Sequence, residues 1–184
     1  MFALERFKED CLRALKEKSQ HVAIKELVAR AVGSPREILK ALGEPRQAGI
    51  ETLYRSEQLT ILKVLWGPGM LLYPHDHRMW AVIGVYVGQE DNAFYRRGGR
   101  GLIGHGNKTL MAKETIPLGE AVIHAVRNPL EKITAALHVY GGDFFGVPRS
   151  EWDPRTLEER PFDLEHARRV FEESNRRLRS AGLA

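Results

Sequence analysis

Cysteine is almost absent from this sequence, which holds a single one, Cys11, among 184 residues. One cysteine cannot form an internal disulfide bond, so a reducing compartment is the simplest expectation. The sequence also lacks any apolar run near the length of about 20 residues that spans a bilayer. Its N-terminal segment is charged throughout and lacks the apolar stretch of a signal peptide. We therefore expect a cytoplasmic protein without a membrane partner.

Long runs of one charge, internal repeats and low-complexity segments are absent as well. Lysine and arginine number 28 against 24 acidic residues, for a net charge of +4. The arginines near the C-terminal end alternate with Glu172 and Glu173, which is typical of a solvated helix face rather than of a nucleic-acid surface. At 43% hydrophobic residues, the chain can bury one sizeable core. We expect a single domain over residues 1–184 that binds no nucleic acid.

Helical spacing of apolar residues is found at both ends of the chain. Residues 1–45 are predicted to be helical, with one segment from about Gln20 to Val32. Ser34, Pro35 and Glu37 combine an N-cap residue, a proline at the first helical position and an acidic residue three places after the cap. These residues predict a short helix that ends near Gly43. A C-terminal helix is predicted over residues 160–181.

Between these ends the apolar period shortens, which predicts β-strands over residues 49–148. Segments rich in β-branched and aromatic residues are separated by glycine, proline and asparagine. The expected strands are 59–66, 70–73, 80–88, 92–97, 109–118, 120–126 and 133–144, and residues 104–107 (Gly-His-Gly-Asn) are expected to form a turn. Short strands at this spacing predict an all-β core, a sandwich or closed barrel, with helices at both ends.

Three histidines of this β region are candidate metal ligands. His75 and His77 are two residues apart, so in a strand both imidazoles point to the same face. His124 ends another predicted strand and can add a third imidazole from a neighbouring strand. Three protein ligands leave coordination positions open, as in a catalytic rather than a structural metal site. Spacing alone does not name the metal.

The spacing around these histidines resembles the two motifs of the cupin superfamily. Gly69 is followed by five residues and His75-x-His77, Gly88 lies eleven positions after His77, and three residues separate His124 from Asn128. The resemblance implies a double-stranded β-helix, the cupin or jelly-roll barrel. In many cupins a glutamate ligand stands four residues after the second histidine. That position is Ala81 here, which leaves a neutral three-histidine site.

Within the cupins, residues 54–145 resemble the thiol dioxygenases, the group of cysteine dioxygenase and 3-mercaptopropionate dioxygenase. The resemblance lies in residues 66–69 (Trp-Gly-Pro-Gly), 74–77 (Pro-His-Asp-His) and 80–88, and in His138-Val139-Tyr140. It implies Fe(2+), O2 and a small thiol carboxylate that is oxidised to a sulfinate. The family's Ser-x-His-x-Tyr relay would be reduced to His138 and Tyr140, because Ala136 replaces the serine.

A substrate carboxylate fits the planar fork of an arginine. The resemblance places the carboxylate-binding arginine at Arg55, and Arg149 is the second candidate. Animal cysteine dioxygenases also have a Cys–Tyr crosslink beside the metal. We expect none here, because Cys11 lies in a predicted N-terminal helix.

Several alternatives remain open from the sequence. Zinc, nickel or manganese could replace iron, with hydrolytic or isomerase chemistry, and a cupin that binds a small molecule without catalysis is a further option. His138 is an alternative to His124 as the third ligand. A homodimer is also an option, because barrels of this kind often pair through exposed strands.

Overall fold

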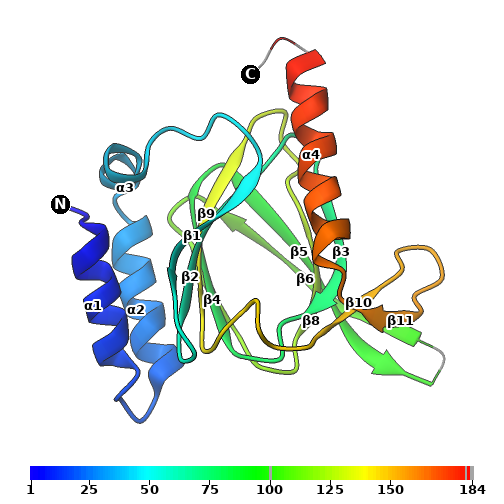
Figure 1. Cartoon of the computed structure of the whole chain (residues 1–184), viewed down its shortest axis with the longest axis horizontal. Helices are drawn as coiled ribbons and strands as arrows, with labels where there is room; N and C mark the ends of the chain where they lie inside the picture. Colours follow the sequence, from blue (N-terminus) through cyan, green and yellow to red (C-terminus); the bar gives the residue numbers. More distant parts are fainter. Residues whose placement is uncertain (100, 181, 183–184) are drawn as a thin grey trace.

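A computed structural model describes residues 1–99, 101–180 and 182 of the chain (Figure 1). Its described helices lie at the two ends of the sequence, as predicted. They are α1 (Leu4–Ala14), α2 (Gln20–Val32), α3 (Pro35–Leu42) and α4 (Leu164–Ser180). None of the helices among the described residues combines the length and the apolar character that crossing a bilayer requires.

The helix α3 begins at Pro35 and ends before Gly43, close to the predicted bounds. Gly43 has a φ of +80°, a left-handed conformation that glycine adopts without strain. The expected cap differs in one respect, because the Ser34 side chain makes no capping hydrogen bond. The start of α3 therefore depends on the proline at its first position and on packing rather than on a serine cap.

Strands form two antiparallel sheets. The five-stranded sheet has the order β1 (Gly49–Arg55), β2 (Thr60–Trp66), β9 (Thr134–Tyr140), β4 (Ala81–Val87) and β7 (Thr115–Leu118). The six-stranded sheet has the order β11 (Glu159–Pro161), β10 (Ser150–Trp152), β3 (Leu71–Asp76), β8 (Ile123–Arg127), β5 (Gln89–Gly98) and β6 (Gly101–Met111). The predicted all-β core, a jelly-roll barrel with helices at both ends, is confirmed.

The strand β4 shows how the core is divided by the five-stranded sheet. Its residues Ile83 and Val85 belong to the cluster inside the barrel, whereas Val82 and Tyr86 pack under the N-terminal helices. Alternate side chains of a strand point to opposite faces, so one sheet separates two apolar layers. Figure 1 shows α1 and α2 along the outer side of this sheet, and α4 at the other side of the barrel.

Two predicted boundaries and one predicted turn are wrong. The β region does not end at residue 148, because β10 and β11 follow and pair with each other. The C-terminal helix begins at Leu164 rather than at 160, and the predicted end at 181 lies outside the described residues. Residues 104–107 lie within β6, where the register shifts opposite Phe94 and Tyr95. These glycines therefore accommodate a β-bulge, not a turn.

Candidate metal centre

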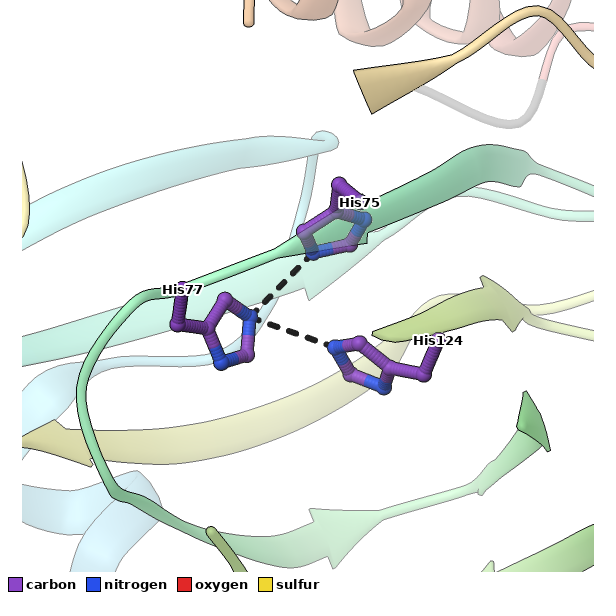
Figure 2. Close-up of side chains that lie close together, drawn as sticks. All are labelled: His75, His77 and His124. Atoms are coloured by element: carbon purple, nitrogen blue, oxygen red, sulfur yellow. Dashed lines mark hydrogen bonds between the residues drawn. The ribbon is translucent and has the colours of Figure 1, made fainter. Parts of the chain in front are cut away.

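The imidazoles of His75, His77 and His124 meet inside the barrel (Figure 2). His75 lies on β3 and is directly paired with His124 on β8, a cross-strand arrangement that brings side chains close together. His77 follows one residue after the end of β3. The Nε2 atom of His77 lies 3.2 Å from Nε2 of His75 and 3.2 Å from Nε2 of His124. All three side chains are buried.

Hydrogen bonds at the far sides of two rings determine which nitrogen faces the centre. The Nδ1–H group of His75 donates to the Tyr73 carbonyl oxygen at 3.0 Å. The Nδ1–H group of His124 donates to Oδ1 of Asn92 at 2.7 Å. In a neutral imidazole the other nitrogen then has the lone pair. Lone pairs of Nε2 thus converge on one point, and a divalent cation fits this donor set.

The electrostatics of the cluster favour neutral rings. Burial lowers the pKa of His75 to about 4. Burial, followed by repulsion from the neighbouring histidines, holds the pKa values of His77 and His124 well below their usual range. A metal ion binds the neutral form of imidazole. The rings are therefore in the ligand form at neutral pH, and the cluster can hold one metal ion through three neutral nitrogens.

His138 and Tyr140 lie beside this cluster on β9. The Tyr140 hydroxyl and Nδ1 of His138 form a hydrogen bond of 2.9 Å, and the Tyr140 ring packs edge-on against His77 with 5.1 Å between ring centroids. Burial raises the pKa of the Tyr140 phenol, so it keeps its proton at neutral pH. His138 is not part of the described three-histidine group, so the alternative in which it replaces His124 is not supported.

Arg149 is the arginine that reaches the interior. It follows the turn after β9, is buried, and is held between the rings of Phe144 and Phe162, with its Cζ atom 3.7 Å and 4.0 Å from their centroids. Its Nη1 atom is buried without a hydrogen-bond partner among the described residues. Burial lowers the pKa of Arg149 to about 10, which still leaves the guanidinium charged at neutral pH.

Arg55, the first choice from the sequence, does not line the cavity. Its Nε and Nη2 atoms donate to both carboxylate oxygens of Asp143 at 2.8 and 2.9 Å, and half of its side chain is exposed. The guanidinium also lies over the Phe145 ring, 5.2 Å from its centroid. Since its fork already binds a carboxylate of the protein, Arg55 is not available to a substrate in this structure. Of the two predicted arginines, Arg149 lines the cavity and Arg55 does not.

A small cavity adjoins the histidines. Its volume is about 30 Å³, which has room for a metal ion or one or two waters. The polar residues that line it are His75, His77, His124, His138, Tyr140 and Arg149. Leu164, Ala167 and Phe171 of α4 contribute to the apolar side. The C-terminal helix therefore covers the candidate metal centre.

Two buried polar residues of β5 were not predicted from the sequence. Asn92 accepts the hydrogen bond from His124, and its Nδ2 atom donates to Oε1 of Glu90 at 3.1 Å. Glu90 also accepts a hydrogen bond of 2.8 Å from Nε1 of Trp66. Glu90 and Asn92 are two residues apart on a strand, so the same spacing argument that identified His75 and His77 could have identified them.

No protein-family model matches the sequence. Solved structures with a similar chain path include an RmlC-like cupin family protein with a double-stranded beta-helix fold from Methanocaldococcus jannaschii, with TM-score 0.46 and 11% identity over 54% of this chain and 84% of that one. A cupin superfamily protein from Desulfitobacterium hafniense has TM-score 0.43 and 13% identity over 54% and 82%. Oxalate oxidase in complex with glycolate has TM-score 0.43 and 15% identity over 54% and 53%. None of these likenesses says what this chain binds.

Proposed function

We propose that this protein is a mononuclear non-haem iron dioxygenase that oxidises a small thiol bearing a carboxylate to a sulfinate. One observation carries the proposal: the three converging histidines line the same cavity as Arg149, whose buried Nη1 atom has no hydrogen-bond partner in the part of the chain that the structure describes. Both oxygen atoms of O2 pass to the sulfur of the thiolate, so the thiol proton is released and no other reductant is needed.

Fe(2+) held by His75, His77 and His124 would supply the redox chemistry and would lower the pKa of a coordinated thiol. Among the described residues the candidate ligand group contains no carboxylate, and the position four residues after His77 is Ala81. The ion therefore keeps its full charge, and an anionic sulfur is favoured over a neutral ligand. The apolar wall from α4 keeps bulk water away from this side of the site.

Arg149 would hold the substrate carboxylate. A guanidinium presents its N–H groups as a planar fork that matches two carboxylate oxygens. The rings of Phe144 and Phe162 clamp this guanidinium from both sides, so its direction is fixed before a substrate arrives. A buried charge with a free N–H group gains much from an anionic partner.

Tyr140 and His138 would control a proton at the reacting sulfur. The phenol retains its proton at neutral pH because burial raises its pKa. Its hydroxyl lies in the cavity wall and is fixed by His138. In this arrangement Tyr140 holds a proton in its hydrogen bond with His138, beside the place where sulfur and oxygen would react.

The size of the cavity favours one second candidate. At about 30 Å³ the space beside the histidines admits a water-sized ligand, whereas a thiol carboxylate needs more room than this. Zinc suits three histidines and one water equally well, and nickel and manganese are further options. A hydrolytic enzyme that activates water at the same three histidines is therefore the alternative.

Metal content and oxygen consumption distinguish these functions. Protein loaded anaerobically with Fe(2+) should consume O2 with cysteine or 3-mercaptopropionate, and poorly with cysteamine, which lacks a carboxylate. Arg149→Lys should raise the KM at least tenfold, because a single ammonium cannot replace the fork. Arg55→Lys is the matched control and should leave the KM unchanged. If the iron-loaded protein consumes no oxygen with any of these thiols, the assignment is wrong.

A further inference from the structure

Glu90 is a buried carboxylate that forms no ion pair with an arginine or lysine among residues 1–99 and 101–180. It is fully buried on β5. The other two buried carboxylates among the described residues, Asp76 and Glu151, each contact arginine. A carboxylate removed from water is strongly destabilising unless a positive charge or several donors compensate it. The compensation for Glu90 must therefore come from the groups that its two oxygens face.

The carboxylate oxygen Oε1 of Glu90 is connected to the candidate metal centre by two hydrogen bonds. It accepts a hydrogen bond from Nδ2 of Asn92, which fixes the amide so that its own Oδ1 faces His124. His124 must then donate through Nδ1 and present the lone pair of Nε2 to the centre in Figure 2. A carboxylate that acts on a ligating histidine in this way also increases the basicity of the ligand. Through these two hydrogen bonds the negative charge of Glu90 would act on a cation held at the centre.

The other carboxylate oxygen of Glu90, Oε2, faces His138. It lies 3.6 Å from Nε2 of His138, a nitrogen that is buried and has no hydrogen-bond partner in the described part of the chain. A lone pair on this nitrogen would face the carboxylate and be repelled, so Nε2 should have the proton. Nδ1 of His138 is then an acceptor, and the Tyr140 hydroxyl donates to it over 2.9 Å.

We propose that Glu90 is a positioning residue that acts on the metal through Asn92 and His124, and on Tyr140 through His138. In this arrangement one carboxylate determines the tautomers of both histidines. Glu90 would thereby fill the role next to His138 that the serine has in the Ser-x-His-x-Tyr relay, where this sequence has Ala136. Glu90 lies on β5 of the six-stranded sheet, whereas Ala136 lies on the same strand as His138, β9. This inference rests on the metal site of the proposed function, but not on the identity of the substrate.

The substitution Glu90→Gln tests both parts of this proposal, because an amide has only one oxygen. Either Asn92 or Trp66, which both donate to Glu90 at present, must then face an NH2 group. We expect Co(2+) titration of the metal-free protein, followed by visible absorption, to show affinity reduced about 10–100-fold. Asn92→Ala should give a similar reduction. The double variant should be weaker than either single variant by less than about threefold, because both act through one path.

The matched control is Asp91→Asn, which removes the same charge from the neighbouring position of β5. Asp91 accepts hydrogen bonds from Gln89 and Thr109 and is not in contact with the histidines. Its Co(2+) affinity should stay within about twofold of the unmodified protein. If the Co(2+) affinity of Glu90→Gln is also within about twofold of that of the unmodified protein, Glu90 does not act on the metal through Asn92 and His124.

Nitrogen NMR of the histidine rings tests the tautomers without an activity assay. In the unmodified metal-free protein, the proton should be on Nδ1 of His124 and on Nε2 of His138. In Glu90→Gln, the proton of His138 should move to Nδ1 in at least part of the molecules. If the proton of His138 is on Nδ1 in the unmodified protein, Glu90 does not act on Tyr140 through His138, whatever the Co(2+) titration shows. Absence of oxygen consumption, by contrast, refutes only the thiol dioxygenase proposal.

Discussion

Acidification should destabilise the metal-free protein well before its carboxylates are protonated. Burial lowers the pKa of His75 from 6.5 to about 4, and the pKa values of His77 and His124 are also well below 6.5. In the unfolded chain each imidazole takes up a proton near its usual pKa. Between these values the unfolded state binds more protons than the folded state. The free energy of unfolding therefore falls as the pH falls.

The size of the effect follows from the shift at His75. One pKa unit corresponds to about 1.4 kcal/mol, so a move from about pH 7 to about pH 5 should remove roughly 2 kcal/mol through His75 alone. The loss should level off below the folded-state pKa of about 4. His77 and His124 act in the same direction. A domain is stable by only about 5–15 kcal/mol, so the loss through His75 alone is an appreciable fraction of the total.

Urea unfolding at a series of pH values, followed by tryptophan fluorescence with a chelator present, measures this loss. His75→Asn removes one titrating ring while Asn can still donate to the Tyr73 carbonyl. Its unfolding free energy should fall by about 2 kcal/mol less than that of the unmodified protein over the same pH range. His105→Asn is the control, because His105 is exposed on β6, and its profile should follow the unmodified protein. Parallel profiles for His75→Asn and the unmodified protein would refute the reasoning.

Three further predictions concern the site and the core. His124→Ala should lose its bound metal on dialysis, and a full metal load by elemental analysis would contradict the ligand set. Tyr140→Phe should keep its metal but lose about 100-fold in kcat, since it removes the hydroxyl that links the reacting atoms to His138; a kcat within about twofold would exclude this role. Gly84→Ala should destabilise the fold by about 1–3 kcal/mol in urea unfolding, because its Cβ would lie 2.5 Å from Val28. Gly119→Ala, with open space around it, should be neutral.

The features that sequence predicted well are those with a local period. The bounds of α2 agree with the predicted segment 20–32, because apolar residues at helical spacing report directly on packing. His75 and His77 share a face through the period of a strand, and the cupin-like spacing linked them to His124. The β-bulge in β6 was missed, since Gly104 and Gly106 satisfy a bulge as well as a turn, and only pairing with β5 distinguishes the two.

The features that sequence could not predict depend on long-range pairing. Arg55 and Asp143 are 88 residues apart, and nothing in the residues around Arg55 indicates that its guanidinium is already occupied. Arg149 lies close to Phe144 in sequence, but its second ring, Phe162, comes from the segment before α4. The burial of Arg149 therefore depends on the path of the chain after β9, which brings Phe162 against it. That path is a property of the tertiary structure.

The charges of the interior lead to a stricter statement about the substrate. With Fe(2+) bound as proposed, the cation and Arg149 contribute three positive charges and Glu90 contributes one negative charge, whereas the buried carboxylates Asp76 and Glu151 are each paired with an arginine. A net excess of about two positive charges then remains in a small, poorly hydrated space. A ligand with both a thiolate and a carboxylate neutralises this excess, whereas a neutral thiol or an amino thiol leaves it unbalanced. The substitution Glu90→Gln increases this positive excess. When the two proteins are compared at equal metal content, we therefore expect Glu90→Gln to bind a dianionic thiol carboxylate at least as tightly as the unmodified protein does. Tight binding of cysteamine to the iron-loaded protein would show that charge does not select the ligand.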